Sequence, residues 1–191
     1  VGTDAPPTES RSKHLIYRGN HLPAWLGHAA HEKTTLTQKY LENLSGQDLV
    51  LDISSDPSDR IYGDEWLSFM KSGKAVIGLE GGASVFDFDE SAEKNVRNFL
   101  CENPAAGYEQ IHSEFLSSIE GNIIYRMITP RSFEAISTKT VQVLYPGEYS
   151  GILEAWKHYL PMNRDFSNAN EICEMLRNDL FLQKMADETY G

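Results

Sequence analysis

A basic and an acidic side chain, Arg131 and Glu134, stand three residues apart in a segment that predicts a helix from Pro130. Residues three apart share one face of a helix, so the two side chains point the same way. A carboxylate can accept hydrogen bonds from two vicinal hydroxyls of a sugar, and a guanidinium can bind a phosphate. The pair therefore predicts contacts to a nucleotide-sugar. The plain alternative is an ion pair on a solvated helix.

A polar, glycine-containing loop follows the strand predicted over 141–145. The loop runs from 146 to 151 and leads into a helix expected over 152–160. It therefore joins the C-terminal end of a strand to the N-terminal end of a helix. Ligands bind at such places in open α/β sheets, because free backbone N–H groups and the helix dipole point outward there.

Four residues of this loop are candidates for ligand contacts. Gly151 lets the backbone approach a ligand closely, and Ser150 can donate to a phosphate. Glu148 would repel a phosphate, so it suits the hydroxyls of a sugar or base. Tyr149 belongs to the same candidate set. The alternative for the whole loop is an ordinary strand-to-helix turn.

Two other predicted strand ends carry similar groups. The strand expected over 75–79 leads into a second candidate site for phosphate or for the donor sugar, made of Glu80, Gly81, Gly82 and Ser84. The glycines match neither the Walker phosphate loop nor the GxGxxG dinucleotide pattern. Arg18 ends the first predicted strand, on the same ligand-binding side.

Strands alternate with helices along the chain. The predicted strands are 14–18, 49–53, 75–79 and 141–145. The predicted helices are 22–44, 63–72, 91–102, 108–118, one that starts at Pro130, 152–160, 170–178 and 180–190. Segment 124–128 fits either type. The alternation predicts an α/β fold with a Rossmann-like, doubly wound parallel sheet. Residues 1–13 have linker composition, and residues 14–191 are expected to form one domain.

The composition restricts the class of protein. The 191 residues are 40% hydrophobic and 24% charged, as in an ordinary globular domain. The formal charge of −11 disfavours nucleic acid, which requires clustered Lys and Arg. No run approaches the roughly 20 apolar residues of a membrane span, and the polar first residues show no signal peptide. Cys101 and Cys173 lack metal-type spacing. We expect a cytoplasmic protein, or one peripheral at the inner face of the membrane.

Several strings of the sequence occur in the order of one enzyme family. They are IYRGNHLPAWLG at 16–27, DRIYGDEW at 59–66, GLEGGASVFDFD at 78–89, PRSFEA at 130–135, GEYSGILEAWKHYLP at 147–161 and DFSN at 165–168. Together they cover most of the chain. The set resembles the donor-binding half of a bacterial GT-B glycosyltransferase, of the family-1/family-4-like group of surface-polysaccharide clusters that is related to the spore-protein CgeB type.

The resemblance implies roles for particular residues. Glu134 would bind the ribose hydroxyls of the nucleotide-sugar, and Arg131 its diphosphate. Arg18 would face the cleft between the two halves of the enzyme and contact phosphate or acceptor. Family-4 members carry a second glutamate eight residues before the first, and here that position holds Arg126. The sugar-contacting glutamate is therefore unplaced, and Glu80 or Glu148 can substitute for it.

The implied activity is the metal-independent transfer of a sugar from the nucleotide-sugar to a glycan or lipid-linked acceptor, with no cofactor, in polysaccharide biosynthesis. The catalytic residue is unassigned, because it would lie mainly on an N-terminal GT-B half. That half is the implied protein partner, and without it we expect little activity. One alternative is a non-catalytic glycosyltransferase-like module that acts in protein assembly. Another is an unrelated flavodoxin-like binding domain.

Two patterns that resemble metal sites are assigned no metal. Asp87 and Asp89 form the DxD pair of the other large glycosyltransferase fold, but the strings above match the metal-independent fold. We expect these aspartates to cap a loop. His28 and His31, followed by Glu32, mimic a zinc-protease helix, but HExxH places its histidines four apart. Here they are three apart, and the sequence shows no third ligand.

Overall fold

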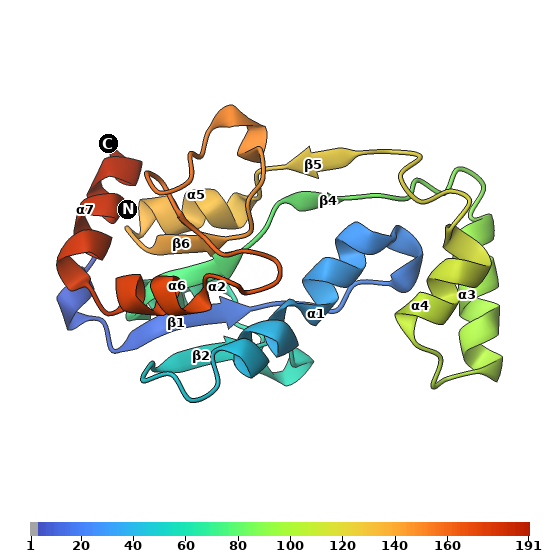
Figure 1. Cartoon of the computed structure of the whole chain (residues 1–191), viewed down its shortest axis with the longest axis horizontal. Coiled ribbons are helices and arrows are strands. Elements are labelled where there is room, and N and C mark those ends of the chain that lie inside the picture. Colours follow the sequence, from blue (N-terminus) through green and yellow to red (C-terminus); the bar gives the residue numbers. More distant parts are fainter. Residues whose placement is uncertain (1–3) are drawn as a thin grey trace.

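The computed structural model describes residues 4–191, and a five-stranded parallel sheet forms its centre (Figure 1). The strands are β1 (Lys13–Arg18), β2 (Leu51–Ser54), β3 (Gly73–Gly78), β6 (Val141–Leu144) and β7 (Leu160–Pro161). They lie in the order β2-β1-β3-β6-β7, and each neighbouring pair is parallel. This confirms the α/β class and the Rossmann-like sheet that the sequence predicts.

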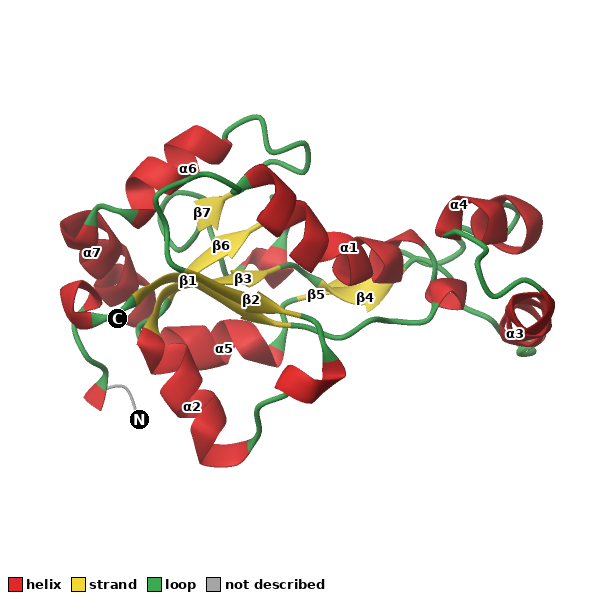
Figure 2. Cartoon of the chain, turned by 90° about the horizontal axis from the view of Figure 1, so that it is seen from below, coloured by secondary structure: helices red, strands yellow, loops and turns green. Residues whose placement is uncertain are grey.

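Helices cover both faces of the sheet (Figure 2). One face carries α1 (His28–Asn43), α6 (Ala169–Leu176) and α7 (Asp179–Tyr190), and the other carries α2 (Gly63–Ser72) and α5 (Pro130–Ser137). Successive strand residues point to opposite faces, so Leu15 and Tyr17 of β1 join the first core and Ile16 joins the second. Within residues 4–191, every helix is too short or too polar to span a lipid bilayer.

The direction of winding reverses at β1. The chain passes from β1 to β2 on one side, and then returns to place β3 on the other side of β1. In open α/β sheets such a switch point leaves a crevice outside the carboxyl ends of the two strands, and ligands bind there. The crevice here follows Arg18 and Gly78, the last residues of β1 and β3.

An antiparallel ribbon extends the molecule beyond the sheet. β4 (Gly81–Ala83) pairs with β5 (Tyr125–Met127), with Gly82 opposite Arg126. The sequence left segment 124–128 open between strand and helix, and the structure makes its middle a strand. Gly81 and Gly82 therefore lie in a strand, although the sequence predicts a loop there.

The ribbon leads to a helical unit at one end of the molecule, the α3–α4 lobe, defined as residues 85–122 (Figure 1). It contains α3 (Ser91–Glu102), α4 (Tyr108–Ile111) and a π-helical turn (His112–Leu116). The helix predicted over 108–118 thus changes its hydrogen-bonding pattern at its second turn. The lobe has its own apolar core, against which Trp25 packs from the turn before α1.

The helix predicted over 22–44 begins later than expected. A short 3-10 turn covers Ala24–Leu26, and the α-helix starts at His28. Gly27 separates the two with φ 82°, a left-handed conformation that a regular helix does not contain. The break points the first turn of α1 toward the α3–α4 lobe.

The prediction of a helix over 152–160 is wrong. Residues 152–159 form turns, in which Trp156 has a φ of 65° and Ala155 bridges to Tyr159, and Leu160 begins β7. The apolar spacing of this segment does not mark one buried face, since Leu153 and Tyr159 are buried while Trp156 is exposed. Turns bury this pair beside β6, where a regular helix would bury one continuous stripe.

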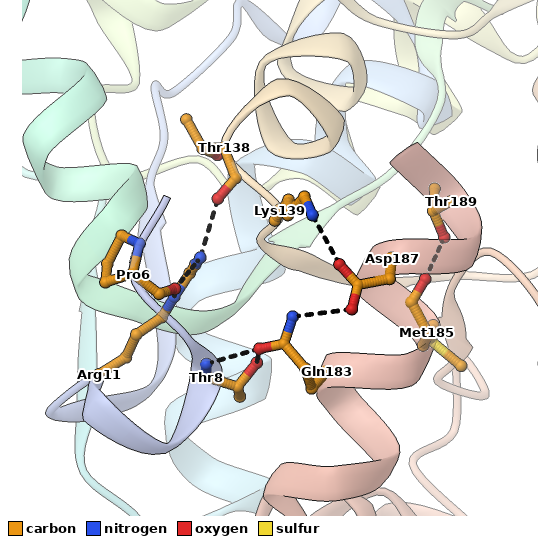
Figure 3. Close-up of polar contacts among 9 residues, drawn as sticks. All are labelled: Pro6, Thr8, Arg11, Thr138, Lys139, Gln183, Met185, Asp187 and Thr189. Atoms are coloured by element: carbon orange, nitrogen blue, oxygen red, sulfur yellow. Dashed lines mark hydrogen bonds and ion pairs between the residues drawn. The ribbon is translucent and has the colours of Figure 1, made fainter. Parts of the chain in front are cut away.

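Residues 4–12 pack against the sheet domain (Figure 3). Arg11 is buried, and its guanidinium donates to the carbonyls of Pro6, Gly73 and Thr138 and to Thr140 Oγ1. The backbone N and the Oγ1 of Thr8 donate to Gln183 Oε1 of α7 at 2.9 and 3.1 Å. Of the linker predicted over 1–13, residues 1–3 lie outside the described part. That the segment joins two domains stays a prediction.

Candidate functional site

A cavity of about 530 Å³ opens at the switch point. Its walls come from the ends of β1 and β3 and from the first turns of α2 and α5, with one side chain from α1. Ligand pockets for small molecules are typically about 300 to 1,000 Å³, so the space suits a nucleotide. Three residues predicted from the sequence line it together, namely Arg18, Arg131 and Glu134.

Glu134 lines the cavity with a carboxylate of which only one oxygen has a hydrogen-bond partner. The indole Nε1 of Trp66 on α2 donates to Glu134 Oε2 at 2.9 Å. Within residues 4–191, no hydrogen bond or ion pair reaches the second oxygen, Oε1. A neutral donor thus fixes the orientation of the carboxylate without neutralising its charge. The oxygen that remains can accept hydrogen bonds from a ligand.

Arg131 lies one turn earlier on α5 and is held by backbone and aromatic rings. Its Nη2 donates to the carbonyl of Arg18 at 2.6 Å. The guanidinium carbon lies 5.0 Å from the ring centre of Tyr17 and 5.5 Å from that of Trp66. In the described part of the chain, no carboxylate forms an ion pair with it. The alternative of an Arg131–Glu134 ion pair is therefore not what the structure shows.

Lys33 of α1 adds a second positive charge that the sequence did not reveal. Its side chain is half-buried and lines the cavity. Between residues 4 and 191, no acidic or hydrogen-bonding side chain is paired with its ammonium. Burial lowers the pKa of Lys33, and the charge of Arg131 lowers it further. A lysine without a partner beside an arginine favours an anionic ligand.

Arg18 lines the same cavity, but its charge is already matched. Its Nη2 lies 2.7 Å from Asp52 Oδ1, and its other nitrogens donate to the carbonyls of Tyr17, Asp52 and Asp59. The guanidinium also stacks over Phe69 at 4.5 Å. Arg18 therefore positions the end of β1. Unmatched positive charge comes from Arg131 and Lys33, and from the exposed Arg60, which also lines the cavity without an ion pair in the described chain.

A glycine allows the end of β1 to close over a buried tyrosine. A Cβ at Gly19 would lie 2.4 Å from Tyr17 Cε1, closer than carbon atoms pack. The Tyr17 hydroxyl is buried and has no hydrogen-bond partner in the described structure. Burial raises the pKa of Tyr17, and Arg131 acts against this shift. The tyrosine thus stays neutral and forms the floor beneath Arg131.

The residues predicted after β3 and β6 lie outside this cavity and bind one another. Glu80 Oε1 accepts a hydrogen bond from the backbone N of Tyr149 at 2.8 Å. A Cβ at Gly147 would lie 2.6 Å from Glu80 Oε2, so the carboxylate fits directly against the loop. The buried Tyr149 donates its hydroxyl to the carbonyl of Tyr145 at 2.6 Å. Glu80 therefore closes the loop that follows β6.

The rest of that loop adopts a left-handed turn. Ser150 has a φ of 56° and Gly151 a φ of 70°. Ser150 Oγ accepts weakly from the backbone N of Ile128, at 3.4 Å. Glu148 is exposed and shows no polar partner within residues 4–191. Ligand binding by these residues stays a prediction, and none of them lines the cavity at the switch point.

Gly82 and Ser84 have structural contacts of their own. The ideal Cβ position of Gly82 falls on the carbonyl of Tyr125, so only glycine fits at this point of the ribbon. Ser84 Oγ accepts from the backbone N of Ala29 at 3.1 Å, in the first turn of α1. These residues hold the ribbon and α1 together, and their predicted phosphate contacts remain untested.

The two aspartates of the DxD pattern cap a helix. Asp87 Oδ2 accepts from the backbone N of Glu93 at 2.9 Å, and Asp89 Oδ1 accepts from that of Ser91 at 3.1 Å. The hydrogen bonds from Ser91 lower the pKa of Asp89. This confirms the expected role of the pair at the start of α3.

A comparison with protein-family models and a search of curated proteins both find no match for this chain. Of the residues that line the cavity, the sequence singled out Glu134, Arg131 and Arg18, and their ligand-binding roles stay predictions. It did not point to Lys33 and Arg60 or to the hydrogen bond from Trp66.

Proposed function

We propose that this chain is the donor-binding domain of a glycosyltransferase, which holds a nucleotide-sugar in the cavity between β1 and β3. One observation carries the proposal. A carboxylate with a free oxygen, Glu134, shares the cavity with three cations that have no acidic partner in the described chain, of which Arg131 and Lys33 are partly buried and Arg60 is exposed. A nucleoside diphosphate has the matching groups, a vicinal diol and two phosphates.

Glu134 is suited to the ribose. The Trp66 indole holds one carboxylate oxygen, so the group is oriented before a ligand arrives. Two ribose hydroxyls can then donate to the carboxylate, mainly to the free Oε1. Hydrogen bonds to a charged acceptor are about twice as strong as neutral ones. Tyr62 lines the cavity and is 69% exposed, which leaves its ring free to stack on the base.

Arg131 and Lys33 are suited to the diphosphate. In the transfer, the bond between the anomeric carbon and the diphosphate oxygen breaks, and the acceptor oxygen bonds to that carbon. Negative charge grows on the departing diphosphate, and fixed cations in a partly dry site stabilise it. The first turns of α2 and α5, which border the cavity, add a positive potential. The base that deprotonates the acceptor would come from an N-terminal half.

The proposal is tested by calorimetry with UDP, GDP, their sugar conjugates and CMP-sugars on the chain as it stands. The sharpest version compares UDP with 2′-deoxy-UDP on the wild type and on Glu134→Ala. If the carboxylate holds the ribose, the deoxy ligand should bind the wild type about tenfold more weakly, at roughly 1.4 kcal/mol for one hydrogen bond. In the variant both ligands should bind equally.

Two results would contradict the proposal. One is that no nucleotide binds at a concentration of about 1 mM. The binding free energy would then be weaker than about 4 kcal/mol. The other is an equal preference for ribose in wild type and Glu134→Ala. Absent nucleotide binding, together with an intact fold, would favour the non-catalytic module of protein assembly.

A further inference from the structure

The first turn of α1 faces the α3–α4 lobe (Figure 1). There one side chain of α1 meets two side chains from a distant part of the sequence. His28 begins α1, His112 begins the π-helical turn, and Glu120 follows that turn. One ligand atom from each lies within 4.8 Å of the others. The imidazole rings of His28 and His112 stack with their centres 4.4 Å apart. None of the three lines the cavity at the switch point.

We propose that His28, His112 and Glu120 bind a divalent transition metal ion, with Zn²⁺ as the best match. Two imidazoles and one carboxylate are a usual ligand set for zinc, whereas Mg²⁺ and Ca²⁺ prefer oxygen ligands. Bonds of about 2.1 Å in a tetrahedral site place ligand atoms about 3.4 Å apart. His112 Nε2 and Glu120 Oε2 already lie 3.6 Å apart.

The surroundings of His28 select which nitrogen faces the metal. The hydroxyl of Tyr108 lies 3.2 Å from His28 Nδ1. Metal-binding histidines commonly engage their second ring nitrogen in a hydrogen bond that fixes the ring. Nε2 is then the ligand atom. His31, which the sequence pairs with His28, instead stacks on Tyr108 at 3.8 Å and supports it.

His112 gives the strongest reason to expect an ion. Its Nε2 is buried, and within residues 4–191 no partner lies within hydrogen-bond distance, since Glu120 Oε2 stops 3.6 Å away. A buried polar atom without a partner costs free energy, so native proteins rarely retain one. Coordination of a metal would satisfy this nitrogen. Glu120 also caps α1, since its two carboxylate oxygens accept from the His28 backbone N at 3.2 and 3.3 Å. This capping does not satisfy the His112 nitrogen.

The backbone at Gly27 allows the Glu120 carboxylate to approach the start of α1. Gly27 has a φ of 82°, and a Cβ there would lie 2.8 Å from Glu120 Oε2 and 2.5 Å from Ser84 Oγ. Glycine therefore lets Glu120 reach the start of α1. The side chains of His112 and Glu120 are only 19% and 16% exposed. A metal at this place would fasten the lobe to α1, with solvent at the fourth position on the side of the exposed His28.

The test is a titration of the full chain, freed of any histidine tag and treated with chelator, by Zn²⁺ in calorimetry and by Co²⁺ in visible absorption. We expect one ion per chain and a tetrahedral cobalt spectrum. His28→Ala and Glu120→Gln should each weaken binding at least about tenfold. His21→Ala, an exposed histidine outside the cluster, is the matched control and should bind like the wild type.

Glu120→Gln keeps an oxygen that can cap α1, so it is the variant best able to preserve the fold, and circular dichroism checks this for each protein. His112→Ala removes the buried nitrogen and should abolish the cobalt spectrum. Absence of binding at about 1 mM metal would overturn the proposal. Equal affinities of folded His28→Ala, Glu120→Gln and His21→Ala would overturn it as well.

Discussion

The regions beyond the ends of β1 and β6 use the same kinds of residue in opposite ways. Beside the end of β1, Glu134 and Arg131 of α5 each make one hydrogen bond that fixes their direction and keep further hydrogen-bonding capacity. After β6, Glu80 and Tyr149 form hydrogen bonds to the loop itself and close it. Both places are strand ends with a nearby glycine and an acid, and only the first borders the cavity.

The difference teaches that a binding site is marked by unused polar capacity rather than by residue type. A carboxylate whose partner is a loop amide stabilises the fold. A carboxylate whose partner is a fixed indole, with one oxygen left over, is available to a ligand. Substitutions at β1 should therefore change ligand affinity, and substitutions at β6 should change stability.

The largest expected effect is at Glu134. Glu134→Ala should weaken nucleoside diphosphate binding about a hundredfold, because two charged hydrogen bonds are lost at roughly 1.5 kcal/mol each. Its free energy of unfolding should fall by only about 1 kcal/mol, because the part-buried Trp66 indole loses its acceptor. Calorimetry against UDP or GDP measures the affinity. Glu148→Ala makes the same change on an exposed residue outside the cavity and should leave affinity intact. Equal losses in both variants would contradict the assignment.

Glu80→Ala should act on stability instead. It leaves the backbone N–H of Tyr149 without its acceptor and opens space against Gly147. We expect the free energy of unfolding to fall by about 2 kcal/mol, measured by urea denaturation. Glu80→Gln retains an acceptor and should lose less. A fall in nucleotide affinity with unchanged stability would instead place Glu80 in the binding site.

Lys33→Met should weaken diphosphate binding about tenfold, or roughly 1.4 kcal/mol, because one cation beside the phosphates is removed. The loss should nearly vanish for the nucleoside without phosphates. If the nucleoside loses as much affinity as the diphosphate, Lys33 does not contact phosphate.

The same variant gives a pH test. The pKa of Lys33 lies below its ordinary value of 10.5. Below the lowered pKa the charged form is buried, and the fold carries the full penalty. As pH rises from the lowered pKa toward 10.5, the folded state releases a proton that the unfolded chain keeps, and the penalty is relieved. Lys33→Met lacks this penalty, so at pH 7 its free energy of unfolding should exceed that of the wild type. The difference should narrow from pH 7 to about pH 10.

The smallest effect is expected at Ser150. Its left-handed backbone costs an ordinary residue about 1–2 kcal/mol, while glycine loses more chain entropy on folding. Ser150→Gly should raise the free energy of unfolding by about 0.5 kcal/mol and leave nucleotide affinity unchanged. Reduced affinity would show that the Ser150 hydroxyl binds phosphate.

The sequence was sufficient for the sheet and for part of the cavity. The apolar runs around Ile16, Val76 and Val143 fix the central strands, and parallel strands bring their ends to one edge. Arg18 reaches the cavity for that reason. Arg131 and Glu134 reach it because the first turns of α5 lie at the same edge of the sheet. The prediction of a helix around Trp156 failed because the apolar spacing of this segment also fits a series of turns. Those turns bury some of the apolar residues and leave others exposed.

Lys33 and the histidine cluster were beyond the sequence for another reason. Which residues of α1 reach the cavity depends on how the helix rotates against the sheet, and the spacing of its apolar residues does not determine this closely. His28 and Glu120 are 92 residues apart and meet only through the packing of the lobe. Such contacts depend on tertiary structure, and local sequence patterns do not predict them.

The most direct test of the central claim is a crystal structure of the chain soaked with a nucleoside diphosphate. The account predicts the ribose hydroxyls within hydrogen-bond distance of the Glu134 carboxylate and the phosphates beside Arg131 and Lys33. A ligand bound at the 147–151 loop, or a cavity at the switch point that stays without ligand at saturating nucleotide, would contradict it.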